Sequence, residues 1–157
     1  MSSFVGFIGK HDLKIDGKGR VTMPARFKNV LREQYPDDCD KVVVRLTLDL
    51  NLTVEPVPEY ARVAEKFENY DDLDEETRRL QEIITGLATV EKIDAGGRIR
   101  LSVDLRAIAG LLREVTLVGR NRSFDIWDRE RWTATQSDTL RDLKHLTEQV
   151  RRKHRAD

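Results

Sequence analysis

A motif of fifteen residues occurs twice in this chain, and the repeat is the feature that most constrains the fold. Residues 14–28 read KIDGKGRVTMPARFK, and residues 92–106, which lie 78 positions later, read KIDAGGRIRLSVDLR. This spacing allows each copy to belong to its own folding unit, so the repeat indicates a tandem duplication. Each copy places an Asp, a Gly and an Arg in one turn between two apolar runs. The Arg is therefore expected to project as a cation supported by the backbone.

The local pattern of each copy predicts a strand, a turn, a second strand and a short helix. Apolar residues alternate with polar ones on both sides of the first turn, at Leu13, Ile15, Val21 and Met23. Because Gly17 and Gly19 can both adopt positive φ, the turn is expected to join the two strands as a hairpin. Pro24 and Ser102 occupy matching places, and both favour a helix start, the first by its fixed φ and the second by capping. The expected helix faces are Phe27, Val30 and Leu31 in the first copy, and Leu105, Ile108, Ala109 and Leu112 in the second.

The similarity between the halves continues beyond the motif at an offset of 72 residues. Residues 43–54 match residues 115–126, because the first half carries a six-residue insertion. Strict alternation of apolar and polar residues from 48 to 54 predicts a strand with one dry face. Each matched strand precedes a predicted helix that carries an aromatic residue, Tyr60 in the first half and Trp132 in the second.

Further helices are predicted between the halves and at the C-terminus. A second connecting helix begins near Asp74 and stops at Gly86. The last helix is expected from Asp138 to about Lys153, because apolar residues recur there at helical spacing. These residues are Leu140, Leu143, Leu146 and Val150. Such a stripe is expected to pack on its own subunit or on a neighbour.

Charge is balanced over the whole chain but is unevenly distributed along it. The 28 basic and 28 acidic residues give zero formal charge, so no global field attracts nucleic acid or an anionic membrane. Residues 10–28 nevertheless carry a net charge of +4, whereas residues 49–76 carry −8. This mosaic suits the binding of a polyanion on one face, with the acidic stretch turned away from it.

Several classes of function find no support in the sequence. The single Cys39 excludes an internal disulfide, and the three histidines have no partner at metal-ligand spacing. A P-loop, a nucleophile elbow and a paired acid and base are all missing. We therefore expect no enzyme activity, no cofactor, no metal and no small-molecule substrate. Because no signal peptide or long apolar run is present, a cytoplasmic protein without membrane contact is expected.

The motif and its surroundings resemble a known family. The run DGKGRVTMPARF at 16–27 and its weaker second copy, together with VTLVG at 115–119 and FDIW at 124–127, resemble the MraZ family of bacterial regulators. The wider relation is to the AbrB/SpoVT-like swapped-hairpin fold. The resemblance extends from about Phe7 to Trp132, and the tandem pair makes it more specific than one such turn would be.

The resemblance implies an α+β fold made of two tandem swapped-hairpin, AbrB-like β-barrel half-domains with appended helices. On this basis we expect a first repeat at 7–54, a helical connector at 55–86, a second repeat at 87–132, and a C-terminal helix and tail at 133–157.

The resemblance also implies a sequence-specific DNA-binding transcriptional regulator of the division and cell-wall gene cluster. Such a regulator acts on its own promoter among others and is associated with the nucleoid. Its implied partners are double-stranded DNA with short promoter repeats and further copies of itself in a ring-like homo-oligomer. Because one turn offers few contacts, several turns on one assembly are expected to be needed for useful affinity.

Carried over by position, Lys18 and Arg20 are the DNA-contacting candidates of the first motif. An arginine at such a tip can pair with guanine edges or bind phosphate, whereas Asp16 is expected to fix the turn. Flanking basic residues extend the candidate set to Lys14, Arg26, Lys28 and, in the second copy, Arg98. The second motif departs from the first, with Gly96 at the place of Lys18, so it is expected mainly to build the fold.

Other interpretations stay open at this point. The two Asp and Arg pairs of the motifs are equally compatible with salt bridges that simply close the turns. The chain is also compatible with a protein-interaction scaffold, because folds are reused for different partners, or with a nonspecific nucleoid-associated protein. A small enzyme on a related barrel would need a catalytic cluster that the sequence does not contain.

Overall fold

The protein has a mixed α+β fold, which confirms the predicted class. The structure is a computed structural model that describes residues 5–70 and 73–155. The strands are β1 (Lys10–Lys14), β2 (Arg20–Thr22), β3 (Lys41–Leu46), β4 (Leu52–Glu55), β5 (Thr89–Lys92), β6 (Arg98–Arg100), β7 (Glu114–Gly119) and β8 (Phe124–Asp128). The α-helices are α1 (Ala25–Gln34), α2 (Val57–Glu68), α3 (Glu75–Ile84), α4 (Val103–Ile108), α5 (Arg129–Arg141) and α6 (Leu143–Lys153). A short 3₁₀ helix, Pro36–Asp38, occupies the insertion of the first half.

The strands of the two repeats interleave with internal two-fold symmetry. A six-stranded antiparallel sheet has the order β1-β7-β8-β4-β3-β5, and a separate two-stranded ladder joins β2 to β6. Each strand of the first repeat has its counterpart at the mirrored position in the second, so β1 on β7 corresponds to β5 on β3. Of the six ladders, only β3-β4 and β7-β8 stay within one repeat. This is the strand exchange that a swapped-hairpin fold implies.

Two details of the predicted strand arrangement need correction. The strands on either side of the first turn do not form a ladder with each other, because β1 pairs with β7 and β2 pairs with β6. Within the described residues the strands also do not close into a barrel, since β1 and β5 are the two free edges of the sheet. The cause is the duplication, which supplies each strand with a matching partner in the other repeat. The division of the chain at residues 54, 86 and 132 stays a prediction.

Local signals place the first helix of each repeat as expected. Pro24 is the N-cap of α1, which buries Phe27, Val30 and Leu31. The Ser102 hydroxyl accepts a hydrogen bond from the Leu105 amide at 3.2 Å and so caps α4. In the core, the rings of Phe7, Phe27 and Phe124 contact one another in edge-to-face and tilted arrangements, with centroid separations between 4.8 and 5.4 Å.

The predicted strand from 48 to 54 is wrong in its first half. Residues between β3 and β4 form a turn in which the Thr47 amide donates to the Asn51 carbonyl at 2.9 Å. The Thr47 hydroxyl also accepts from the Asp49 amide, a local bond that competes with strand formation. Leu50 adopts φ 59, and Leu48 is 81% exposed. The regular alternation of Leu with polar residues therefore belongs to a hairpin loop at this point.

Two helix predictions also need correction. Helix α4 ends at Ile108, because Gly110 follows at φ 66 in the left-handed conformation that stops helices. Leu112 consequently lies outside the helix and is 86% exposed. The C-terminal helix is two helices, α5 and α6, separated at Asp142, whose φ of −107 and ψ of 18 interrupt the helical path.

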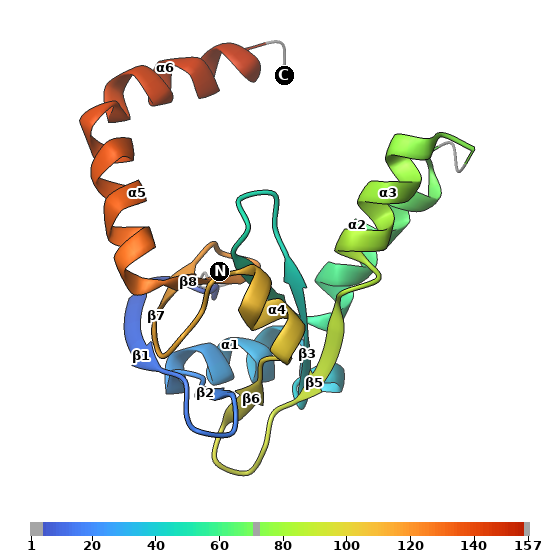
Figure 1. Cartoon of the computed structure of the whole chain (residues 1–157), viewed down its shortest axis with the longest axis vertical. Coiled ribbons are helices and arrows are strands. Elements are labelled where there is room, and N and C mark those ends of the chain that lie inside the picture. Colours follow the sequence, from blue (N-terminus) through green and yellow to red (C-terminus); the bar gives the residue numbers. More distant parts are fainter. Residues whose placement is uncertain (1–4, 71–72, 156–157) are drawn as a thin grey trace.

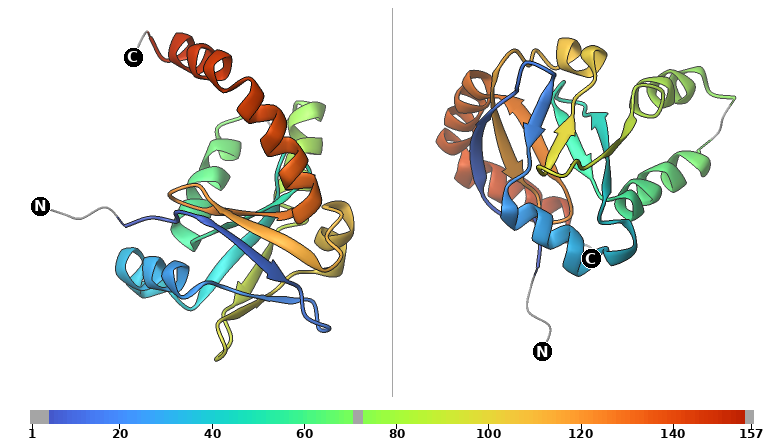
Figure 2. Two further views of the ribbon diagram at one scale, coloured as in Figure 1. Left: turned by 90° about the vertical axis from the view of Figure 1, so that its left-hand side faces the viewer. Right: turned by 90° about the horizontal axis from the view of Figure 1, so that it is seen from below.

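The helices that follow each half lie on opposite flanks of the sheet. Helices α2 and α3 stand on one flank and α5 and α6 on the other, as two of the views show (Figure 1; Figure 2, right). Both pairs extend away from the end of the molecule where the loops before β2 and β6 project (Figure 1). This arrangement separates the acidic connecting helices from the two repeated turns.

Candidate nucleic-acid interface

The first repeated turn is organised by the carboxylate of Asp16. Its Oδ1 accepts hydrogen bonds from the Lys18 and Arg20 amides, each at 2.9 Å, and its Oδ2 accepts from Arg20 Nε at 2.9 Å. The backbone closes the same turn, because the Asp16 amide donates to the Arg20 carbonyl at 2.8 Å. Gly19 adopts φ 78, a conformation that favours glycine. Gly17, by contrast, does not take positive φ, so only one glycine of the pair is needed for the turn.

The second turn repeats this geometry with a different sequence. Asp94 Oδ1 accepts from the Gly96 amide at 3.0 Å and from the Arg98 amide at 2.9 Å, and Oδ2 accepts from Arg98 Nε at 2.9 Å. Gly97 adopts φ 76, as Gly19 does in the first turn. The Asp, the positive-φ Gly and the Arg therefore define the turn, and the lysine at position 18 is not required for it.

Hydrogen bonding holds both carboxylates in their charged form. The Arg20 amide, followed by the Lys18 amide and the Arg20 side chain, lowers the pKa of Asp16 below its ordinary value of 3.8. The Arg98 amide and side chain lower the pKa of Asp94 in the same way. Both effects favour the ionised carboxylate because the donors bind it better than the neutral acid.

The two turns lie at the two ends of the β2-β6 ladder. In the β2-β6 ladder Arg20 is opposite Arg100 and Thr22 is opposite Arg98. Arg20 Nη1 also reaches Asp94 Oδ2 at 3.5 Å, so the first arginine bridges both turns. The loops that contain them project from the same end of the molecule (Figure 1). The two motifs thus contribute to one surface.

Both motif arginines are engaged in turn-closing ion pairs, as one of the alternatives from the sequence expected. Their side chains nevertheless remain partly accessible, with 25% exposure for Arg20 and 39% for Arg98. An arginine has five N–H donors in a planar fork, and only part of the fork is used by the carboxylates here. The ion pairs therefore orient these guanidinium groups without covering them.

The remaining predicted cations occupy different places around this surface. Lys18 is exposed at the tip of the first turn, and Arg26 is exposed in the first turn of α1. Lys28 lies on α1 beside the second turn, where it lines a hollow of about 340 Å³ together with Arg32 and Asp94. In the described part of the chain, none of the side chains of Lys18, Arg26 and Lys28 forms an ion pair with a carboxylate.

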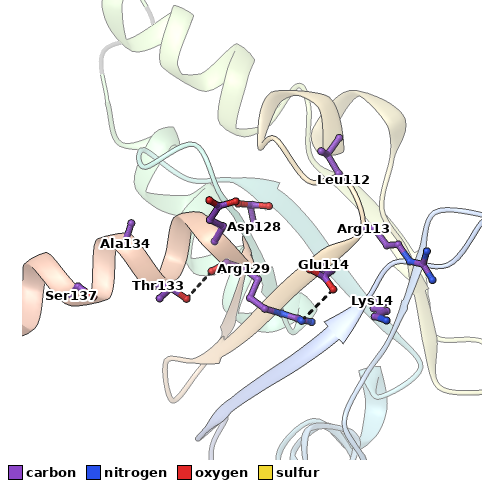
Figure 3. Close-up of a pocket in the computed structure, with 10 residues that line it drawn as sticks. Lys14, Leu112, Arg113, Glu114, Asp128, Arg129, Thr133, Ala134 and Ser137 are labelled. Carbon is purple, nitrogen blue, oxygen red and sulfur yellow. Dashed lines mark hydrogen bonds and ion pairs between the residues drawn. The ribbon is translucent and has the colours of Figure 1, made fainter.

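Lys14 belongs to another hollow. It stands opposite Glu114 in the β1-β7 ladder and lines a pocket of about 910 Å³ between these strands and α5 (Figure 3). Arg113 and Arg129 also line that pocket, and Arg129 donates to the Leu13 carbonyl at 2.7 Å and approaches Glu114 and Asp12 at 3.7 Å each. Acidic groups therefore offset much of the positive charge around Lys14.

Two cations near the turns were not among the sequence-based candidates. Arg100 extends the β2-β6 ladder opposite Arg20, and Arg106 on α4 approaches Gly19 of the first turn. The repeat contained a usable signal for Arg106, because it occupies the place that Lys28 has in the first copy. Arg100 matches Thr22, so the alignment of the copies gave no such signal for it.

The chain is similar in sequence to known proteins. A family model described as "MraZ protein, putative antitoxin-like" matches residues 84–153. A protein of Thioalkalivibrio sulfidiphilus named Transcriptional regulator MraZ is 34% identical over 90% of this chain and 93% of its own length. Proteins with the same name from a Marinomonas species and from Neisseria meningitidis are 35% and 36% identical, over 85% and 87% of this chain and 87% and 89% of their own lengths.

The chain belongs to the MraZ family. Its relatives are named transcriptional regulators, and the family is one of regulators, not of enzymes. Within residues 5–70 and 73–155, no group of His, Cys, Asp and Glu side chains is arranged to hold a metal ion. None of the helices formed by these residues has the length and apolar character needed to cross a membrane.

Proposed function

We propose that this MraZ-family protein binds duplex DNA in a sequence-dependent way through the surface formed by its two repeated turns. In this proposal it regulates the division and cell-wall gene cluster, including its own promoter. It works in the cytoplasm, associated with the nucleoid, and needs neither catalysis nor a cofactor. The single observation that carries the proposal is the grouping of both turns and their arginines at one end of the molecule, away from the acidic helices.

The shape and chemistry of this end support DNA as the ligand. The β2-β6 ladder is a two-stranded ribbon, and a ribbon of this kind can enter the major groove. Arg20 and Arg98 are held by carboxylates in defined orientations, which lowers the entropy lost when they contact a base edge or a phosphate. Lys18 extends from the tip and suits a phosphate contact. Arg26 and Lys28 add positive charge beside the ribbon, and Lys14 lies at its margin.

We further propose that the active form is a ring-like homo-oligomer. One ribbon offers few contacts, so linking several on one assembly would raise the affinity through effective concentration. Helix α6 supports this idea because none of its residues is buried. Three apolar side chains of α6 and the nearby Leu140 of α5 are between 41% and 58% exposed. These side chains are Leu140, Leu143, Leu146 and Val150.

The opposite flank offers a complementary surface for the next copy. Leu80 and Ile83 of α3 are 41% and 46% exposed, and acidic residues occupy the first turn of this helix. Basic residues occupy the last turn of α6. Because α3 and α6 stand on opposite flanks (Figure 2), a contact between them is heterologous, and such contacts build rings when the rotation closes.

The direct test compares binding of the parent and Arg20→Ala to DNA from upstream of the protein's own gene and to a scrambled duplex. Binding is titrated over a range of salt concentrations, and the particle mass is measured for each protein. Arg62→Ala is the matched control, because Arg62 also forms an ion pair, with Glu59 at 3.8 Å, but on α2, away from the two turns. The parent and the control should prefer the upstream duplex, and Arg20→Ala should lose that preference at unchanged particle mass.

The other outcomes separate the alternatives. Equal binding of the parent to both duplexes would contradict sequence-dependent regulation and favour a nonspecific nucleoid-associated protein. No binding to either duplex would favour a protein-interaction scaffold, for which the exposed apolar faces of α3 and α6 are the supporting observation. A monomeric parent would contradict the ring.

A further inference from the structure

Each turn is covered by a cation from the other repeat. A Cβ atom built on Gly19 would lie 2.9 Å from Arg106 Nη2, and one built on Gly97 would lie 2.5 Å from Lys28 Nζ. Gly19 belongs to the first repeat and its cation Arg106 to the second. Gly97 belongs to the second repeat and its cation Lys28 to the first. The missing side chain of each glycine thus allows a basic group to approach the backbone of the turn.

The two arrangements are counterparts under the internal symmetry. Gly19 and Gly97 are separated by the 78 residues of the repeat, and so are Lys28 and Arg106. Both glycines have nearly the same φ, 78 and 76. Both turns therefore contact a cation from the matching helix position of the other repeat, an arginine at the first turn and a lysine at the second.

These helix cations are less neutralised than the motif arginines. Arg20 contacts Asp16 and Asp94, and Arg98 contacts Asp94. Arg106 donates from Nε to the Leu101 carbonyl at 3.0 Å, which leaves its Nη groups for another acceptor. Among the residues that the structure describes, neither Arg106 nor Lys28 forms an ion pair with a carboxylate.

The positions of the two cations suit the two sides of a DNA groove. The Leu101 amide donates to the Gly19 carbonyl, and the Met23 amide donates to the Gly97 carbonyl, each at 2.8 Å. The two glycines consequently mark opposite ends of the β2-β6 ladder. Four residue-to-residue steps, from Gly19 to Met23, separate these ends, or about 13 Å at roughly 3.3 Å per step. The major groove of B-DNA is about 12 Å wide.

We propose that Lys28 and Arg106, each seated on the turn of the other repeat, bind backbone phosphates of duplex DNA on the two sides of the groove that the β2-β6 ladder enters. The second turn is then part of the DNA-binding surface, in contrast to the expectation from its sequence that it mainly builds the fold. This inference rests on the proposed function and deepens it, because it adds phosphate contacts by the helix cations Lys28 and Arg106 to the contacts of the motif arginines.

The test measures how the affinity for the upstream duplex depends on salt in Lys28→Gln and Arg106→Gln. In a plot of log K against log salt concentration the slope is negative, and each phosphate contact makes it steeper by about 0.9. Both variants should therefore make the slope shallower by about 0.9 for each bound subunit while keeping the preference for the upstream duplex. Lys66→Gln is the matched control, because Lys66 is an exposed cation on α2 at the opposite end and should leave the slope unchanged.

Arg106→Lys separates the charge from the packing of the side chain. It retains the positive charge but loses the bond from Nε to Leu101, so it should keep most of the slope. The thermal midpoint of each variant is measured beside the slope, and a variant that no longer folds is replaced in the comparison by its partner at the equivalent position.

Unchanged slopes in folded Lys28→Gln and Arg106→Gln, with Arg20→Ala still losing the DNA preference, would overturn this inference and leave the proposed function in place. A parent protein that binds no DNA would overturn both.

Discussion

The two repeated turns reach the same conformation from different sequences. Asp16 and Asp94 accept the same three kinds of hydrogen bond, and Gly19 and Gly97 differ in φ by only 2°. What differs is the charge around them, since Lys18 stands where the second turn has Gly96. The shape of the turn therefore depends on three residues, whereas its chemistry toward a ligand is set by the others and by the helix of the opposite repeat.

The repeats also differ in the size of the core residue at matching positions of α1 and α4, Phe27 and Leu105. Phe27 of α1 contacts the rings of Phe7, His11 and Phe124, whereas Leu105 is the buried residue of the shorter α4. Phe27→Ala should lower the free energy of unfolding by about 3–5 kcal/mol, and Leu105→Ala by less, because it removes a smaller side chain. Denaturant unfolding at one protein concentration measures both. A larger loss in Leu105→Ala would contradict the expectation that the larger of the two matching side chains contributes more to the core.

The positive-φ glycines should respond alike to substitution. Gly19→Ala and Gly97→Ala should each destabilise the protein by about 1–2 kcal/mol, because a left-handed conformation is costly for a residue with a Cβ. Gly17→Ala is the control in the same turn, since Gly17 lacks positive φ and has open space around its Cβ position. Thermal unfolding of the three variants checks the expectation. If Gly17→Ala were as damaging as Gly19→Ala, backbone conformation would not explain the loss.

Adding the missing lysine to the second turn should reduce the difference between the turns. Gly96→Lys requires a small shift of the Arg98 side chain, because its Cβ would lie 3.2 Å from Arg98 Nε. The variant should make the dependence of log K on log salt concentration steeper by about 0.9 for each bound subunit. A titration against the upstream duplex measures this gain, and Gly96→Gln serves as the uncharged control. Equal slopes in the two variants would mean that the tip of the second turn does not reach a phosphate.

A smaller effect is expected from the acid response of the turns. Because the pKa of Asp16 is lowered in the folded protein, its stabilising contribution is present above pH 3.8 and is lost as the pH falls through the folded value. The difference in thermal midpoint between the parent and Asp16→Asn should therefore be largest near pH 7 and shrink below pH 3.8. Asp94→Asn should show the same trend with a larger difference at neutral pH, since Asp94 also contacts Arg20. A gap that widens in acid would contradict this.

Local features of the fold could be predicted from the sequence because their causes are local. The cap at Ser102, the helix start at Pro24 and the N-cap at Asp74 all depend on residues within one helical turn. The turn closed by Asp16 likewise lies within residues 16–20. Propensity and hydrogen bonding over such short distances are encoded by the residue types themselves.

Partner choice between strands could not be predicted in the same way. The alternation around the first turn correctly indicated strands, but their partners are β7 and β6, which lie far away in the chain. Alternation was also misleading at Leu48 and Leu50, where side-chain hydrogen bonds favour a loop. Of the candidate site, the positions of Lys18, Arg20 and Arg98 in their turns followed from the motif. The placement of the two turns on one surface and the approach of Arg106 to Gly19 required the three-dimensional exchange of the repeats.

The most direct test of DNA binding by the turns is hydrogen exchange of the full-length protein with and without the upstream duplex. Peptides that contain residues 16–20 and 94–98 should gain protection together, whereas peptides from α2 and α3 should exchange as in the free protein. The scrambled duplex serves as the control and should give weaker protection at the same salt concentration. Protection confined to α2, α3 or α6, with both turns unchanged, would contradict DNA binding through the turns.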